Sequence, residues 1–138
     1  MRRAVWILVF TFAAGTAAGL MADRLLNAQQ EPVKRTVLLK TDLEGIQGKE
    51  ANAFVIELAP GAATGRHYHP GHEIAYVLEG MASVHIDGKP AATQQRGAVI
   101  HLTPKLIHDV KNPSKSEPMK AVVFALYEKG QPTTTPAK

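Results

Sequence analysis

Apolar residues occur in short runs along most of this chain, and glycine, proline and polar residues separate the runs. A typical run is EIAYVLE at 73–79, which ends at Gly80, and Asp87-Gly88 marks a two-residue hairpin. After residue 30, no helical period extends over two turns. The pattern predicts strands at 37–39, 54–59, 65–69, 73–79, 83–86, 91–96, 98–102, 108–111 and 121–127. We therefore expect an all-β domain, an antiparallel sandwich or a jelly-roll barrel.

The first 28 residues differ from this pattern. Arg2 and Arg3 precede an uncharged stretch that runs to Met21, which is typical of a secretory signal peptide. An uncleaved membrane anchor over residues 4–22 is the alternative, because the stretch approaches the roughly 20 residues that a spanning helix needs. We expect an exported protein, either periplasmic or secreted, or anchored to the membrane by its N-terminus. The predicted division is a signal peptide or anchor (1–28), a linker with the first strand (29–49), a β-barrel (50–128) and a disordered tail (129–138).

Composition narrows the choice of function. The 138 residues are enough for one domain and too few for two ordinary ones. The absence of cysteine excludes disulfides and thiolate metal ligands. The net charge of +4 comes without any basic run interleaved with aromatic residues, so nucleic-acid binding has no support.

Four side chains have the spacing of a metal site. His67 and His69 are two residues apart, so on a strand their imidazoles point to the same face. Glu73 follows a Pro-Gly break that can turn its carboxylate back toward the same point, and His108 arrives much later in the chain. Three imidazoles and one carboxylate suit one divalent transition metal (Mn, Fe, Co, Ni, Cu or Zn) and are poor ligands for Ca or Mg.

The same residues resemble the cupin family. The first cupin motif has a His-x-His pair and a glutamate between two glycines, and every fixed position is filled: Gly61, His67, His69, Glu73 and Gly80. The second motif is partly present, with Gly97, His108 and Asn112 at the expected spacing. Thr103 and Lys105 stand where the family usually has proline and glycine, which puts the shape of the loop before His108 in doubt.

This resemblance implies a small double-stranded β-helix with one metal inside it, over roughly residues 50–128, and often a dimer. The family includes dioxygenases, decarboxylases, isomerases, storage proteins and sugar-binding sensors, so the motif specifies a site and leaves the reaction open. The leading hypothesis is an exported metal-binding protein that acts as a metal-dependent dioxygenase or oxidoreductase on a small organic molecule. The alternatives are a non-catalytic binder of metal or small ligand, and a metal-dependent isomerase or lyase.

Strand alternation predicts the wall of the pocket. Side chains at even spacing from Glu73 and His108 share the face of those residues, and most of them are small and apolar. His101 lies in an apolar strand beside the motif, where it lines the pocket, hydrogen-bonds a ligand or is a partly buried histidine with its own partner. His72 should face the opposite way from Glu73, and we interpret it as a non-ligand or as an alternative ligand in place of a neighbour. The predicted pocket-lining residues are Ala75, Val77, His101 and Val110.

Overall fold

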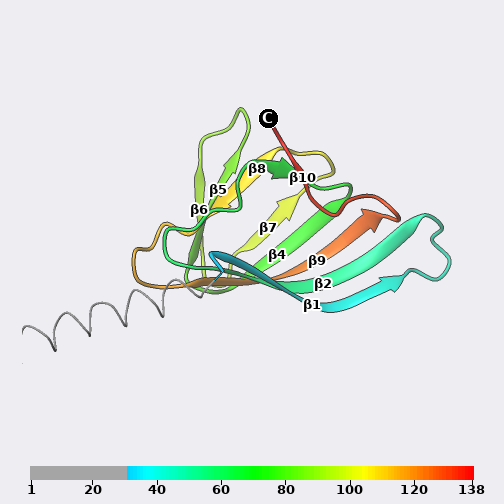
Figure 1. Cartoon of the computed structure of the whole chain (residues 1–138), viewed down its shortest axis with the longest axis horizontal. Helices are drawn as coiled ribbons and strands as arrows, with labels where there is room; N and C mark the ends of the chain where they lie inside the picture. Colours follow the sequence, from blue (N-terminus) through cyan, green and yellow to red (C-terminus); the bar gives the residue numbers. More distant parts are fainter. Residues whose placement is uncertain (1–30) are drawn as a thin grey trace, which may run out of the picture. The chain divides into compact units, whose positions relative to one another are not determined.

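The computed structural model describes residues 31–138, and the predicted signal peptide or anchor lies outside these residues. The described part consists of β-strands joined by turns (Figure 1). The strands are β1 (Val33–Asp42), β2 (Lys49–Leu58), β3 (His67–Tyr68), β4 (His72–Glu79), β5 (Met81–Ile86), β6 (Ala92–Gln95), β7 (Val99–Leu102), β8 (His108–Lys111), β9 (Met119–Glu128) and β10 (Thr135–Pro136). No helix between residues 31 and 138 is long and apolar enough to cross a membrane.

The strands form two five-stranded antiparallel sheets. One sheet has the order β1-β2-β9-β4-β7 and the other has the order β10-β3-β8-β5-β6. Strands that are far apart in the sequence are neighbours in both sheets, as Figure 1 shows for β4 and β9. This crossed order is that of a jelly roll, and it confirms the predicted all-β fold.

The core lies between the inner faces of the two sheets. Along β9 the buried side chains alternate with more exposed ones from Met119 to Tyr127, which is the period of a strand with one face covered. Leu58 and Met119 belong to one apolar cluster, and Phe54 and Tyr127 belong to another. Full burial of an apolar side chain of this size contributes about 1.5–3 kcal/mol, so these two clusters hold the sheets together.

A close backbone approach fixes the turn between β3 and β4. A Cβ atom at Gly71 would lie 1.8 Å from the carbonyl oxygen of Leu126, so only glycine fits there. Glu73 then pairs in register with Ala125 on one side and with Leu102 on the other. Packing of this turn against β9 therefore helps to fix the position of Glu73 along the sheet.

The N-terminal strand is longer than predicted. β1 runs from Val33 to Asp42 and pairs with β2, whereas the apolar pattern predicted only residues 37–39. Nearly all of its side chains are exposed, so its sequence does not show the alternation of apolar and polar residues that marks a half-buried strand. It is an edge strand that the backbone hydrogen bonds to β2 hold in place.

The prediction of a disordered tail over 129–138 is wrong. Thr135–Pro136 forms β10 and pairs with β3. The amide of Ala137 donates to the carbonyl of Arg66 at 3.0 Å, and Nη1 of Arg66 donates to the carbonyl of Lys138 at 2.7 Å. The tail is ordered by these polar contacts with a sheet edge, which a search for apolar runs does not detect.

Candidate metal centre and its cavity

Three histidines meet at one point inside the barrel. His67 and His69 come from β3 and the residue after it, and His108 begins β8. His67 and His108 face each other directly across the β3–β8 pair. One ring nitrogen from each histidine lies within 4.8 Å of the others, and all three side chains are buried. Three of the four ligands predicted from the sequence are thus brought together from segments about 40 residues apart in the chain.

Hydrogen bonds set the tautomer of each ring. Every Nδ1 in the triad lies within hydrogen-bond distance of a backbone carbonyl oxygen, which can only accept. Each neutral ring therefore carries its proton on Nδ1 and presents the lone pair of Nε2. The contacts are His67 with Gly65 at 2.7 Å, His69 with Thr133 at 2.6 Å and His108 with Leu106 at 2.9 Å.

The close approach of the three Nε2 atoms favours a bound cation. Nε2 of His67 and Nε2 of His69 are 3.1 Å apart, so two lone pairs face each other. Burial lowers the pKa of His69 and of His108 to about 4, which keeps both rings neutral near pH 7. A divalent transition metal satisfies all three Nε2 atoms at once, so the donor set fits the metal that the family implies.

Glu73 lies beside the triad. Its Oε2 is 3.2 Å from Nε2 of His69, but the cluster of mutually close ligand atoms contains only the three histidines. The hydroxyl of Tyr127 donates to Oε1 of Glu73, and both side chains are buried. Burial raises the pKa of Glu73, and the Tyr127 hydrogen bond opposes part of this shift. Glu73 is therefore placed as a neighbour of the metal position, held in one orientation by Tyr127.

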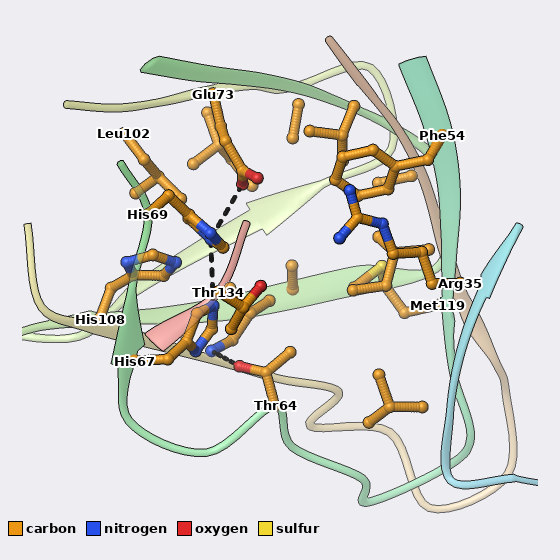
Figure 2. A pocket seen from close by; sticks show the side chains of 18 residues that line it. Arg35, Phe54, Thr64, His67, His69, Glu73, Leu102, His108, Met119 and Thr134 are labelled. Atoms are coloured by element: carbon orange, nitrogen blue, oxygen red, sulfur yellow. Dashed lines mark hydrogen bonds and ion pairs between the residues drawn. The ribbon is translucent and has the colours of Figure 1, made fainter. Parts of the chain in front are cut away.

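A cavity of about 200 Å³ adjoins the triad and is walled mostly by apolar side chains (Figure 2). Ala75 and Val110 line it, as strand alternation predicts. Val77 is fully buried on the same face of β4 but is not among the lining residues. An apolar wall of this kind accepts the hydrocarbon part of a small organic molecule.

The prediction that His101 lines the pocket is wrong. Glu73 pairs with Leu102 and Ile74 pairs with His101, so Leu102 faces inward and His101 faces outward. His101 is exposed and stacks on His72, with Nε2 of His101 3.1 Å from Nδ1 of His72. His72 lies on the outer face, as expected for a non-ligand. The register between β4 and β7 decides this point, and the sequence pattern does not give that register.

Four further residues belong to the site. Arg35 and Phe54 line the cavity opposite the triad, with the guanidinium carbon 3.6 Å from the centre of the Phe54 ring (Figure 2). Tyr127 could have been found, because it has the parity of the buried residues of β9. Arg35 and Thr134 fall in segments interpreted as linker and tail, where no pattern marked them.

A comparison with known protein families agrees with this site and this fold. Residues 54–125 match the family model described as a cupin domain, which is more than half of the chain. The chain belongs to the cupin family. No curated protein matches it.

Solved structures share the fold. A cupin-like protein from Thermotoga maritima MSB8 is 24% identical with a TM-score of 0.62, over 76% of this chain and 75% of that one. An uncharacterized conserved protein with a double-stranded beta-helix domain, from Klebsiella pneumoniae subsp. pneumoniae MGH 78578, is 21% identical with a TM-score of 0.63, over 80% and 88%. DMSP lyase DddQ from Ruegeria pomeroyi DSS-3 is 18% identical with a TM-score of 0.62 over 77% of this chain, which spans only 52% of the lyase.

Proposed function

We propose that this protein is an exported, metal-dependent enzyme that converts a small organic molecule inside its barrel. The observation that carries the proposal is the convergence of three buried Nε2 lone pairs on one wall of an apolar cavity. A purely structural metal site is closed on all sides by protein ligands, whereas a catalytic site keeps a position open toward its substrate. Here the cavity adjoins the triad, so a small molecule in the cavity can reach that position.

The metal would be held by His67, His69 and His108, with Glu73 as the fourth ligand. When bound, it would supply a Lewis acid or a redox centre. The protein's own residues prepare the site. The three backbone carbonyls fix the imidazole orientations, and Tyr127 orients the Glu73 carboxylate. The apolar walls exclude water from the reacting groups.

Metal content tests the site directly. The purified protein is expected to hold about one transition-metal ion per chain, measured by elemental analysis after dialysis. Alanine at His67, His69 or His108 should weaken metal affinity roughly 100-fold or more, because each substitution removes one of three neutral nitrogen ligands. His85→Ala is the matched control, since His85 is exposed and lies outside the triad. Equal metal content in His108→Ala and His85→Ala would exclude the site.

Oxidation by dioxygen is the first reaction class that we propose, and the apolar wall around the triad supports it. Oxygen uptake by iron-, copper- or manganese-loaded protein over a panel of phenols, flavonoids and aromatic carboxylates tests this class. No uptake above that of the His108→Ala variant, with the metal site filled, would contradict it for those substrates.

A metal-dependent lyase or isomerase is the second candidate. The buried pair of the Tyr127 hydroxyl and the Glu73 carboxylate favours it, because two groups that can exchange a proton lie beside the metal position. The fold that the chain shares with a DMSP lyase is compatible with this class. Turnover that continues under anaerobic conditions, with no oxygen consumed, would select the second candidate over the first.

Export is part of the proposal, and the basic start and uncharged stretch of residues 1–28 support it. A chain exported unfolded would acquire its metal outside the cytoplasm, where the affinity order favours copper or zinc. Mass spectrometry of protein from its own cell envelope gives both the N-terminal residue and the metal. Manganese or iron in a periplasmic protein would contradict loading after unfolded export.

We also propose a homodimer. Apolar side chains on neighbouring strands of the outer face of the first sheet support it, because Ile74 pairs with Phe124 and both are about half exposed. Leu126 continues the same patch with 50% exposure. Patches of this kind on soluble domains mark interaction surfaces. Light scattering with size-exclusion chromatography should give a dimer for the wild type and a monomer for Phe124→Glu.

A further inference from the structure

Arg35 is placed to contact anything that enters the cavity. In the β1–β2 register it pairs with Ile56, and both residues line the cavity. Its guanidinium lies over the Phe54 ring, across the cavity from the three histidines (Figure 2). The neighbouring Lys34 alternates to the other face of the strand, where it reaches Glu57 at 3.8 Å.

The charge of Arg35 is not neutralised by a carboxylate. Within residues 31–138 it forms no ion pair; Nη1 donates to the hydroxyl oxygen of Thr133 at 3.3 Å, and the guanidinium also interacts with the Tyr127 hydroxyl. Its positive charge nevertheless acts on the site, since it contributes to lowering the pKa of Glu73 and of His69. Arg35 is exposed where it borders the apolar cavity, so its guanidinium offers a positive charge to an anion that enters the cavity.

The stacking on Phe54 does not itself occupy the N–H donors of Arg35, one of which contacts Thr133. A guanidinium that lies over a ring uses its flat face, while its N–H bonds point outward in the plane. Those donors match the two oxygens of a carboxylate, which they bind as a pair of parallel hydrogen bonds. Apolar side chains such as Ile100 and Leu102 line the same cavity.

From this geometry we propose that Arg35 binds a carboxylate of the substrate, so that the natural ligand is a small organic acid. The assignment rests on the proposed metal-dependent function and names the substrate class of that same site. The carboxylate lies at Arg35, and the hydrocarbon part extends along the apolar wall toward His67, His69 and His108. A cavity of about 200 Å³ limits the acid to one ring or a short chain.

A structural role for Arg35 makes a different prediction. If the side chain only anchored the edge strand β1 to Phe54, its loss would affect stability and leave ligand preference unchanged. Arg35→Lys keeps the charge and loses the paired donors, and Arg35→Gln loses the charge. Lys34→Gln is the matched control, because it removes the same charge from the same strand on the opposite face.

Fluorine NMR of the full-length, zinc-loaded protein tests the proposal, because zinc supports no redox turnover. The probes are 4-fluorobenzoate, 4-fluorophenylacetate and 5-fluoropentanoate, each compared with its primary amide. For at least one pair the wild type and Lys34→Gln should bind the acid roughly tenfold or more tighter than the amide. Arg35→Gln should lose this preference, and Arg35→Lys should retain only part of it.

The outcomes separate this proposal from the metal-dependent function. Zinc content is measured on the same samples. A zinc-loaded wild type that prefers none of the three acids, or a preference that survives in Arg35→Gln because the acid binds the metal alone, overturns the assignment of Arg35. Protein that takes up no zinc overturns the metal-dependent function, whatever binds at Arg35.

Discussion

The backbone carbonyl of Thr133 accepts a hydrogen bond from Nδ1 of His69 at 2.6 Å. The hydroxyl of the same residue accepts one from Arg35 at 3.3 Å. Thr133 precedes β10, outside residues 54–125 that match the cupin domain. A residue of the C-terminal segment thus joins a predicted metal ligand to the cation across the cavity.

Removal of residues 131–138 should therefore weaken metal binding without unfolding the barrel. The deletion removes the acceptor that holds the proton of His69 on Nδ1, and loss of such a partner costs about 10- to 100-fold in metal affinity. The core clusters contain no residue of this segment. Competition with a chelator measures the affinity, and deletion of 137–138 alone, which retains Thr133, is the control. Unchanged affinity in the longer deletion would show that Thr133 does not orient His69.

Tyr127→Phe should destabilise the metal-free protein by about 1–3 kcal/mol, because the buried Glu73 carboxyl loses its hydrogen-bond donor. Urea unfolding followed by circular dichroism measures the change. Tyr76→Phe is the matched control, since Tyr76 is 44% exposed on the outer face of β4. Equal stabilities of the two variants would mean that the Tyr127 hydroxyl contributes nothing to the site.

Metal-free protein should lose stability as the pH falls from about 6.5 toward 4. The folded pKa of His69 and of His108 is lowered to about 4, so their contributions are complete above pH 6.5 and disappear as the unfolded rings take up protons. Each histidine gives a slope of about 1.4 kcal/mol per pH unit. The raised pKa of Glu73 acts in the opposite direction and offsets at most one histidine's share.

Urea unfolding at a series of pH values checks this slope. His108→Gln should reduce it, whereas His85→Gln, which removes an exposed histidine, should retain it. A stability that does not change between pH 6.5 and 4.5 would contradict neutral, buried imidazoles in the folded protein.

Lys105→Gly should stabilise the protein by about 0.5–1 kcal/mol. Lys105 has a φ of +60°, a left-handed conformation that strains a side chain and suits glycine, the residue usual at this position of the family. Its amide donates to the carbonyl of His69 at 2.9 Å, and this hydrogen bond stabilises the loop in its strained conformation. Lys111→Gly, within β8, should instead destabilise by a similar amount. Thermal unfolding of the two variants distinguishes them.

Sequence reasoning could predict the inner face of the barrel because burial and strand alternation leave a period of two. Glu73, Ala75 and Val77 all point inward for this reason. The His-x-His spacing likewise put two imidazoles on one face. At Lys105, where the family usually has glycine, the backbone takes the left-handed conformation that favours glycine.

The rest depended on information that a single strand does not contain. His101 faces outward because of the register between β4 and β7, which is set by pairing across the sheet. Arg35 and Thr133 come from polar or exposed segments whose order results from hydrogen bonds to distant strands. These residues reach the cavity only through the pairing of β1 with β2 and of β10 with β3.

The stacked pair of His72 and His101 has a practical consequence for counting ions. Two exposed imidazoles on neighbouring strands, with nitrogens 3.1 Å apart, are expected to chelate nickel or copper at the surface. In an excess of either ion the protein would bind more metal than the interior triad holds. The His101→Ala variant would lack this surface pair. The number of metal ions that it binds per chain would then measure the buried triad alone.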